Sequence, residues 1–265
     1  MRNELISLAV MAGDAIREVY ESGSWETVLK ADNSPLTKAD RASHAILFDG
    51  LTRIAPRIPV LSEESDEIPF ETRKDWDSYF LIDPLDGTRE FVARIPEFAI
   101  NIALISKGHP VMGLIHSPLE RTTLFAEKGK GLVKVKDGST NLSLNANSSS
   151  SRTVRVLLSH TDKTAGLGPL LARIPEHSLL RKGSSLKFCD VAEGKADFYP
   201  RLKPSMEWDT ASGTIVVEES GGFVCDLTGT RIEYNRKDML NPPFFVIGKT
   251  LLEKLPDWEK RFLQI

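Results

Sequence analysis

The stretch Leu81-Ile-Asp-Pro-Leu-Asp-Gly-Thr88 decides the fold, because an apolar strand runs directly into two acids, a proline and a glycine. Asp83 and Asp86 offer the oxygen ligands that Mg²⁺ prefers, while Pro84 and Gly87 are typical of a tight turn. If a helix starts after Gly87, its first backbone amides can face an anion. The stretch therefore predicts a magnesium site at the end of a strand. Turn formation alone is the alternative, because Asp-Pro and Asp-Gly are common dipeptides in loops.

Acids elsewhere in the chain match the needs of such a site. Glu63 and Glu64 lie upstream, and Trp208-Asp-Thr210 lies far downstream. A phosphate ester is an anion, so carboxylates that converge on it would repel it unless metal cations lay between them. Bound Mg²⁺ can lower the pKa of a water toward neutrality and so make a nucleophile. Because the sequence has no P-loop, Ser-His-Asp pattern or cysteine nucleophile signature, it favours phosphate-ester hydrolysis by metal-activated water.

Each of these acids also has an ordinary structural interpretation. Glu63 and Glu64 can form a solvated surface pair. Asp40 can complete a helix cap begun by Thr37, and Asp209 can cap the helix expected after it. These interpretations are compatible with function, because helix N-termini are also places where anions and their metals bind.

Length and composition set the broad class of the protein. The 265 residues can bury a full core, as one large domain or two packed halves. With 41% hydrophobic residues, 27% charged residues and a formal charge of -3, the chain has no basic bias toward nucleic acid. Cys189 and Cys225 are too far apart for a disulfide framework or zinc cage, which favours reduced thiols in the cytoplasm. The N-terminus has no long apolar run, and nowhere in the sequence do about 18 apolar residues follow one another, which argues against a signal peptide or a transmembrane segment. Peripheral association with the inner face of the membrane is left open, as is the oligomeric state.

The periodicity of the first half predicts an α+β arrangement. Apolar residues at helical spacing indicate an amphipathic helix over 3–20, and Thr37 is expected as the N-cap of a second helix. Between turn signals, four antiparallel strands are expected at 79–83, 98–106, 111–115 and 122–126.

The second half has a different rhythm. The polar, serine-rich segment 141–151 predicts a boundary between residues 1–147, which carry most of the candidate metal ligands, and 148–265. Beyond it, strands are expected at 154–158, 178–180, 196–199, 223–226 and 244–247, with helices at 163–173, 185–193 and 209–220. This alternation predicts an α/β second half.

Taken together, the motifs resemble the lithium-sensitive, magnesium-dependent phosphatase superfamily that contains inositol monophosphatase, fructose-1,6-bisphosphatase and 3'(2'),5'-bisphosphate nucleotidase. The resemblance spans nearly the whole chain. It is carried by Asp83-Pro-Leu-Asp-Gly-Thr88 and Trp208-Asp-Thr-Ala-Ser-Gly213, together with Glu63-Glu64, in this order. It implies an α/β fold arranged as a layered α-β-α-β-α sandwich.

The resemblance also implies a site with two or more Mg²⁺ ions. Glu63 and Asp83 would hold one ion together with the Leu85 carbonyl. A second ion would be held by Asp83, Asp86 and Asp209.

The attacking water would be handled by other residues of the same motifs. By resemblance, Thr88 and Asp40 would position and deprotonate this water. Glu64 matches the second acid of the family and would orient ligands or water without binding the metal directly.

Several segments are similar to the bacterial bisphosphate nucleotidases, which convert adenosine 3',5'-bisphosphate to AMP. They are Lys30–Thr37, Val60–Glu64, Arg89–Phe91 and Gly183–Cys189. This branch implies a small-molecule phosphorylated substrate and no nucleic acid. Such an activity would clear a by-product of sulfate assimilation.

The second phosphate of such a substrate needs a site of its own. Lys187 supplies a point charge, and Gly183, Ser184 and Ser185 supply a small polar turn at a helix start. His160 and Arg201 are expected near the nucleotide. The remaining expected substrate contacts are Glu63, Leu85, Asp86, Gly87, Thr88 and Asp209. The alternatives are that Lys187 is an exposed helix lysine, that Ser184 or Ser185 only caps a helix, and that His160 and Arg201 have no role.

Two positions depart from common family patterns. Ser62 stands where the inositol branch usually has glycine, which favours the nucleotidase branch, and Ser212 stands where alanine is more usual. Neither change removes a ligand.

The sequence therefore predicts hydrolysis of the 3'-phosphate of adenosine 3',5'-bisphosphate, with 3'-phosphoadenosine 5'-phosphosulfate as a further substrate. One alternative keeps the chemistry but makes the substrate an inositol monophosphate or a sugar bisphosphate, because the metal site does not select the leaving alcohol. The other is a non-catalytic, metal-dependent binder of phosphorylated ligands. Against this last alternative, every position assigned a ligand or water-positioning role carries a competent side chain.

Overall fold

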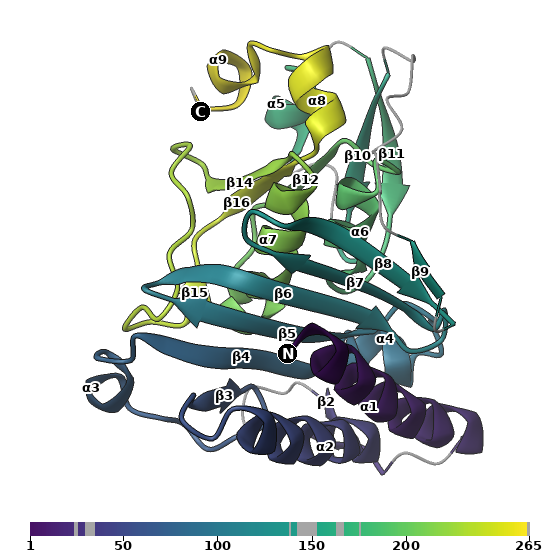
Figure 1. Ribbon diagram of the computed structural model, residues 1–265. Helices are drawn as coiled ribbons and strands as arrows, with labels where there is room; N and C mark the ends of the chain where they lie inside the picture. Colours follow the sequence, from purple (N-terminus) through teal and green to yellow (C-terminus); the bar gives the residue numbers. More distant parts are fainter. Residues whose placement is uncertain are drawn as a thin grey trace.

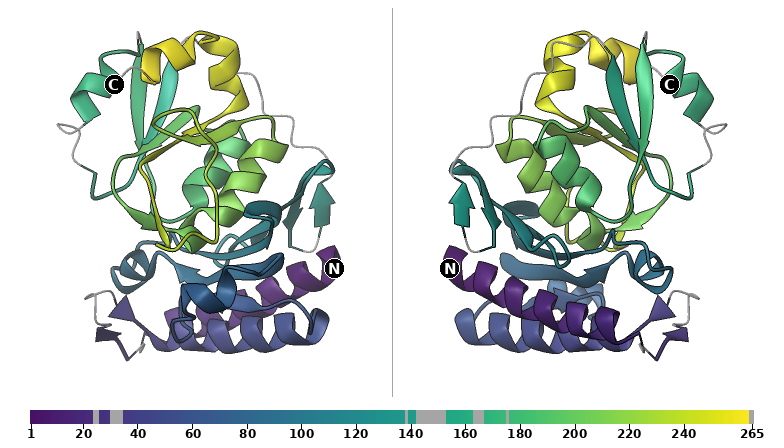
Figure 2. Two further views of the ribbon diagram at one scale, coloured as in Figure 1. Left: turned by 90° about the vertical axis from the view of Figure 1, so that its left-hand side faces the viewer. Right: turned by 90° about the vertical axis from the view of Figure 1, so that its right-hand side faces the viewer.

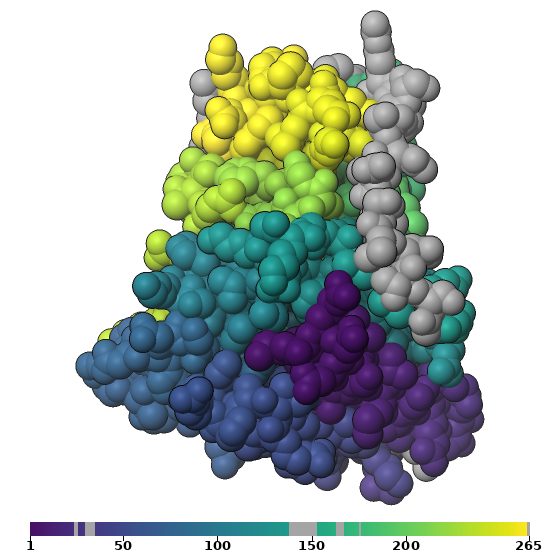
Figure 3. All heavy atoms as spheres, viewed as in Figure 1, coloured from purple at the N-terminus to yellow at the C-terminus, as the bar shows by residue number. Residues whose placement is uncertain are grey.

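Helices and sheets alternate in five layers in the computed structural model of the chain (Figures 1 and 2). The structure describes residues 1–23, 26–29, 35–137, 139–141, 153–162, 167–174 and 176–263. The expected α-β-α-β-α sandwich is confirmed. On the visible surface the layers also follow the chain order, from the N-terminal helices at the bottom to the C-terminal helices at the top (Figure 3).

The first sheet has seven strands within the described residues. In spatial order they are β3 (Val60–Ser62), β4 (Ser78–Asp86), β5 (Ala99–Ser106), β6 (His109–Ser117), β7 (Thr122–Glu127), β8 (Gly131–Lys136) and β9 (Ser139–Asn141). Only the β3–β4 pair is parallel, so the expected antiparallel series is confirmed. Strand β4 continues past residue 83, where the sequence predicted its end, to Asp86, and its pairing with β5 shifts in register between Asp83 and Asp86. Pro84 lies in this shift, since proline cannot donate a ladder hydrogen bond.

Two long helices cover one face of this sheet (Figure 2). They are α1 (Arg2–Ser22) and α2 (Lys38–Ile54), and their buried apolar residues share one core with that face. The predicted cap of α2 is confirmed: Thr37 Oγ1 accepts a hydrogen bond from the backbone of Ala39, and the Asp40 carboxylate accepts one from the Thr37 backbone. Shorter elements complete this half: β1 (Val28–Leu29), β2 (Pro35–Leu36), α3 (Phe70–Arg73) and α4 (Thr88–Val92).

The second sheet has five strands in the described part of the chain, in the order β11 (His177–Arg181), β10 (Val154–Leu158), β12 (Phe198–Arg201), β16 (Phe244–Ile247) and β14 (Phe223–Asp226). Parallel pairs join β10 to β11 and β12, whereas β16 pairs antiparallel with β12 and β14. Between the sheets lie α6 (Leu186–Ala192) and α7 (Ala211–Glu219), within the largest apolar core. The outer face is covered by α5 (Gly168–Leu171), α8 (Lys249–Lys254) and α9 (Trp258–Phe262). The small sheet of β13 (Ser205–Met206) and β15 (Leu240–Asn241) lies apart from both.

Two helix predictions need correction. The helix expected over 163–173 is only α5 in the described residues, and 163–166 lie outside them. It ends before Ile174 because the residue preceding Pro175 is disfavoured in a helix. The helix expected from 209 begins instead at Ala211, after the separate 3-10 turn η2 (Glu207–Asp209).

Other sequence predictions fall where the structure is not described. The boundary between 147 and 148 and most of the Lys30–Thr37 segment lie outside the described residues. Among the helices that are described, none is long and apolar enough to cross a membrane.

Candidate active site

Three of the predicted acids converge at one edge of the seven-stranded sheet. Glu63 directly follows β3, and Asp83 lies in the adjacent parallel strand, so the two strands bring these acids together. Asp209 reaches the same place from η2. One carboxylate oxygen of each acid lies within 4.8 Å of the others. An all-oxygen donor set at this spacing fits a hard divalent cation such as Mg²⁺ or Ca²⁺.

The electrostatics of this acidic cluster, Glu63, Asp83 and Asp209, also call for a cation. Asp83 is only 1% exposed. Burial raises the pKa of Asp83 well above its ordinary value, and repulsion from Glu63 and the other acids raises it further. The pKa of Asp209 is raised for the same reasons, burial first and then Asp86 and Glu63. A divalent cation among these oxygens would reverse both effects by stabilising the ionised carboxylates.

Asp86 lies beside the cluster at the irregular end of β4. Its carboxylate accepts a hydrogen bond from the Ser185 backbone, which comes from the other half of the chain. Gly87 follows with φ of 94°, and a Cβ at this position would lie 3.0 Å from the Glu97 carbonyl, so glycine is required. The expected helix then begins at Thr88, as α4.

Asp40 and Thr88 form a hydrogen-bonded pair next to these acids. Thr88 Oγ1 lies 3.0 Å from Asp40 Oδ1 and 3.0 Å from the Leu85 carbonyl, and its single proton can be donated to one of them at a time. Asp40 Oδ2 accepts hydrogen bonds from the Thr37 backbone at 2.7 Å and from its hydroxyl at 2.6 Å. Burial raises the pKa of Asp40, although the bonds from Thr37 oppose this shift. Asp40 therefore completes the cap and also faces the site.

Glu64 is not a member of the carboxylate cluster in the described residues. Its backbone N–H donates to Ser62 Oγ at 3.3 Å, and the same hydroxyl lies 2.9 Å from His44 Nδ1 on α2. Ser62 thus links β3 to α2 immediately before the acids. The role of Glu64 in orienting ligands stays a prediction.

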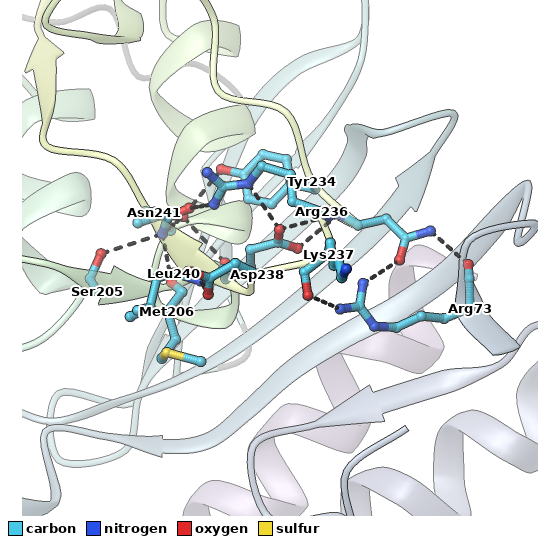
Figure 4. A network of polar contacts seen from close by, with 12 residues as sticks. Arg73, Ser205, Met206, Tyr234, Arg236, Lys237, Asp238, Leu240 and Asn241 are labelled. Carbon is cyan, nitrogen blue, oxygen red and sulfur yellow. Dashed lines mark hydrogen bonds and ion pairs between the residues drawn. The ribbon is translucent and has the colours of Figure 1, made fainter. Parts of the chain in front are cut away.

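The turn that carries Asp209 is held by a polar network drawn in Figure 4. Asp209 Oδ2 accepts a hydrogen bond from the Met206 backbone at 2.8 Å. The neighbouring Glu207 is fully buried, and its carboxylate accepts hydrogen bonds from the backbones of Asn235 and Arg236. The Arg236 guanidinium also donates to it, at 3.2 Å. Asp209 is therefore fixed by its own turn and is not the N-cap of α7, a position that Thr210 occupies.

The same network reaches across the molecule (Figure 4). Asn241 accepts from Arg236 and donates to the Met206 carbonyl and to Thr210 Oγ1. Arg73, in the first half, donates to the Asn235 side chain at 2.8 Å and accepts from it through its carbonyl. The position of Asp209 thus depends on residues that are distant in the sequence.

A cavity opens directly beside the acidic cluster. Its described lining combines hydroxyl groups, cations, carboxylates and aromatic rings, among them Ser159, Ser184, Lys187, Glu90, Tyr199, Arg201 and Phe244. Asp86, Gly87 and Asp209 line both this cavity and the cleft that holds Glu63 and Asp83. The two spaces are therefore adjacent.

Lys187 is buried, which excludes the exposed-lysine alternative. It is only 5% exposed, and its ammonium donates to the carbonyls of Lys182 and Ser184 and lies 5.2 Å from the centre of the Tyr199 ring. Burial lowers the pKa of Lys187 to about 8, against the opposing effect of Asp86. Lys187 thus supports the turn at the start of α6 and also brings positive charge to the cavity.

Arg201 is also brought to the cavity, whereas His160 is not among its lining residues. Arg201 donates to Ser159 Oγ at 3.2 Å. His160 Nε2 instead lies 2.6 Å from a Glu97 carboxylate oxygen, which also accepts from the Gly183 backbone. A side chain at Gly183 would meet Glu90, since an added Cβ would lie 2.8 Å from its Cγ.

Some lining residues were missed by the sequence interpretation. Ser159 and Thr161 follow the end of β10, and Tyr199 lies within β12. A signal for the first two was present, because ligands in α/β sheets bind beyond the carboxyl ends of strands. Ser185 was noted only as part of a polar turn, although its backbone binds Asp86.

Carboxylates that converge at the edge of a sheet, beside a cavity with cationic and hydroxyl groups, fit the site of a metal-dependent phosphatase in a layered α/β sandwich. The chain belongs to the inositol monophosphatase family, whose model matches residues 1–257. It is 42% identical to the 3'(2'),5'-bisphosphate nucleotidase CysQ of Shigella flexneri, over 93% of this chain and 99% of that protein. The corresponding protein of Escherichia coli strain K12 is 41% identical with the same coverage.

Solved structures agree with this assignment. CysQ from Bacteroides thetaiotaomicron, described as a bacterial member of the inositol monophosphatase family, is 35% identical with a TM-score of 0.79, covering 94% of this chain and 97% of that chain. The extragenic suppressor protein suhB from Bartonella henselae is 28% identical with a TM-score of 0.78, covering 99% of this chain and 98% of that chain. The resemblance inferred from the motifs is confirmed.

Proposed function

We propose that the protein is a Mg²⁺-dependent phosphomonoesterase that removes the 3'-phosphate of adenosine 3',5'-bisphosphate to give AMP and phosphate. Its further substrate would be 3'-phosphoadenosine 5'-phosphosulfate. The observation that carries the proposal is that Asp86, Gly87 and Asp209 line both the acidic cleft and the adjacent cavity, which also contains Lys187 and Arg201. A substrate with two phosphates needs such adjacent sites, and the similar CysQ proteins are named for this activity. Because Cys189 and Cys225 are free thiols, the proposal places the activity in the cytoplasm.

The residues that would hold Mg²⁺ are Glu63, Asp83 and Asp209, with Asp86 and the Leu85 carbonyl beside them. When bound, the metal supplies charge stabilisation and a water of lowered pKa. The chain supplies the groups that orient and deprotonate. In the proposed roles, the Thr88 hydroxyl donates a hydrogen bond to Asp40 Oδ1. A lone pair on Thr88 Oγ1 can then accept a hydrogen bond from the attacking water.

Asp40 is suited to receive the Thr88 proton. Its Oδ2 is held by both donors of Thr37, so the carboxylate cannot rotate away from Thr88. Its raised pKa brings its basicity closer to neutrality than that of a solvated aspartate. Asp40 and Thr88 would thus act as a fixed unit: as the water attacks, its proton would pass to Thr88 Oγ1 while the Thr88 proton passes to Asp40 Oδ1.

The phosphate that is not cleaved would lie in the cavity near Lys187, Arg201 and Ser184. Arg201 contributes a guanidinium whose Nε is buried without a hydrogen-bond partner in the described part of the chain. Tyr199 and Phe244 provide aromatic surface in the same cavity. Cations with aromatic surface suit a nucleotide better than a small cyclic polyol.

The direct test is phosphate release from adenosine 3',5'-bisphosphate, inositol 1-phosphate and fructose 1,6-bisphosphate in parallel, each with Mg²⁺ and with EDTA. We expect magnesium-dependent release with a strong preference for the nucleotide. Preference for inositol or sugar phosphate would keep the metal chemistry and reject the assignment of the cavity. Magnesium binding without release from any substrate would favour a non-catalytic binder.

Lys187 provides a second test, through pH. Because the pKa of this lysine is about 8, its positive charge is present below pH 8 and is lost as the pH rises above it. We expect KM for adenosine 3',5'-bisphosphate to rise above pH 8 in the wild type. In Lys187→Met, which keeps the apolar stem, KM should already be raised about tenfold at pH 7 and should lack this pH dependence. Unchanged KM in the variant would contradict the proposed role.

A further inference from the structure

Asn101 on β5 lies in a buried polar group behind the acids. It pairs in register with Asp83 across the β4–β5 ladder, so both side chains are on the sheet face that α6 and α7 cover. Asn101 is 1% exposed. Its Oδ1 accepts hydrogen bonds from Ser185 Oγ at 2.7 Å and Ser212 Oγ at 3.1 Å. Its Nδ2 has no partner among the described residues.

These contacts join three elements at one point. Ser185 is the N-cap residue of α6, and Ser212 lies in the first turn of α7, three residues after Asp209, the last residue of η2. The Ser185 backbone N–H binds the Asp86 carboxylate. A continuous path therefore runs from the β5 side chain that pairs with Asp83, through Ser185, to Asp86.

The three polar side chains of Asn101, Ser185 and Ser212 are an unusual group for the middle of an apolar core. The surrounding core between the sheets consists of aliphatic and aromatic residues. A buried amide with an unpaired N–H₂ destabilises a fold, and such groups are rare in native proteins. The presence of Asn101 here therefore calls for a functional explanation. Ser212 adds a second buried hydroxyl to this group.

We propose that Asn101 is a positioning residue for the metal site. By accepting from both hydroxyls it fixes the Ser185 turn against the β5 strand, and the turn in turn orients Asp86 beside Asp83. Ser212 on α7 restricts rotation of the Asn101 amide through its hydrogen bond to Oδ1. The inference rests on the proposed function only in taking these acids as metal ligands, and it does not depend on which phosphate ester is cleaved.

The principal test measures metal affinity in Asn101→Ala. Calorimetric titration with Mg²⁺, without substrate, gives the affinity independently of turnover. Loss of residues that orient metal ligands commonly weakens metal binding by about 10-fold or more, and we expect about a 10-fold loss here. The half-saturating Mg²⁺ concentration for phosphate release should rise to the same extent, while kcat at saturating Mg²⁺ falls by less than about threefold. Mg²⁺ affinity equal to that of the wild type would overturn the proposal.

A second variant keeps the test decisive if Asn101→Ala does not fold. Ser212→Ala is a small change that suits a helix, and it removes one of the two hydrogen bonds to Asn101. It should weaken Mg²⁺ binding by about threefold, because the amide keeps only the Ser185 contact. Added to Asn101→Ala, it should have no further effect, since Ser212 acts through Asn101. Independent effects that multiply in the double variant would contradict this path, as would a Ser212→Ala variant with wild-type affinity.

Thr123→Val is the matched control. The Thr123 hydroxyl lies in the same sheet, is 1% exposed and is 2.8 Å from His116 Nδ1. Phe125, two positions later in the same strand, packs in the core between the sheet and helices α1 and α2. Residues two apart in a strand share a face, so the Thr123 side chain lies on the sheet face opposite to that of Asp83. The control should lower the melting temperature and leave Mg²⁺ binding unchanged. If it weakens Mg²⁺ binding as Asn101→Ala does, the effect is a general consequence of lost stability and the proposal fails. Absence of phosphatase activity in the wild type would reject the proposed function, whereas the calorimetric comparison would still decide the role of Asn101.

Discussion

The two turns that present Asp40 and Asp209 use the same local contact but differ in what surrounds it. In each, one carboxylate oxygen accepts a hydrogen bond from the backbone N–H three residues earlier, from Thr37 at 2.7 Å and from Met206 at 2.8 Å. The other oxygen of Asp40 meets the Thr88 hydroxyl, whereas Asp209 offers an oxygen to the acidic cluster. The same backbone arrangement thus orients a proposed proton acceptor in one place and a proposed metal ligand in the other.

Support for the two turns comes from different distances along the chain. The Asp40 turn is the first turn of α2 and is held by Thr37 within the same segment. The Asp209 turn is only three residues long and depends on Arg236 and Asn241, which come from a later segment. The proposed chemical role of each aspartate therefore follows from what surrounds the carboxylate. The sensitivity of each turn to mutation follows from whether the residues that hold it are near or distant in the sequence.

Asp209→Asn should have the largest effect. Asparagine keeps an acceptor for the Met206 N–H but removes one negative charge from the cluster. Because metal charge stabilisation is worth several kcal/mol, we expect kcat to fall by about 10³-fold. Calorimetry should show weakened Mg²⁺ binding in the same variant. Wild-type turnover would show that Asp209 is not a ligand and would end the comparison.

Asp40→Asn should reduce turnover without affecting the metal. A positioned general base contributes about 10² to 10⁴ in rate, and we expect a kcat loss of about 10²-fold. Mg²⁺ affinity should stay near the wild-type value, since Asp40 is held by Thr37 and Thr88. The two variants are compared by calorimetry and steady-state kinetics at saturating Mg²⁺. Equal losses of Mg²⁺ affinity in both would assign the same role to the two acids.

Arg236→Met tests the long-range support of the Asp209 turn. It removes the cation that donates to the fully buried Glu207 carboxylate, and breaking such a pair destabilises by about 3 kcal/mol. Burial raises the pKa of Glu207 and Arg236 lowers it, so the variant should raise it further. A raised folded-state pKa means that stability is retained at low pH and lost as the pH rises through that pKa. The deficit in urea unfolding should therefore be smaller at pH 5 than at pH 8.

Arg231→Met is the control for this measurement. Arg231 comes from the same region and pairs with Glu218, but its side chain is 54% exposed. Exposed pairs contribute less than about 1 kcal/mol, so the control should unfold nearly as the wild type does. A comparable loss in both variants would show that burial of Glu207 does not set the stability of the turn.

The contrast between local and distant support also explains what could be predicted from the sequence. Thr37 and Asp40 stand three residues apart ahead of an apolar period, which is a local signal, and the cap formed as predicted. The layered fold and most strands followed from periodicity and from the resemblance. The contacts between Arg73 and Asn235 join residues on different halves of the chain, and no local pattern encodes them.

Burial and pairing in the cavity were equally hard to predict. Lys187 lies on a short helix, where the pattern alone allows an exposed side chain, and only packing between the two sheets buries it. The place of His160 near the nucleotide stays a prediction, and its ring lies next to Glu97, 63 positions earlier in the chain, a contact that no local pattern encodes. The acids were easier to predict because they stand in short local sequence motifs. Their partners depend on tertiary structure.

Thr37→Val should have the smallest effect and tests the local support of Asp40. It removes the hydroxyl that accepts from the Ala39 backbone at 3.1 Å and donates to Asp40, but keeps the Thr37 N–H. Loss of an N-cap side chain costs about 1 kcal/mol, so urea unfolding should show a loss well below that of Arg236→Met. Thr37→Ser, which keeps the hydroxyl, should remain within about 0.5 kcal/mol of the wild type. If Thr37→Val instead destabilises as much as Arg236→Met, the support of Asp40 is not local, and the two turns differ only in the neighbours of their free oxygens.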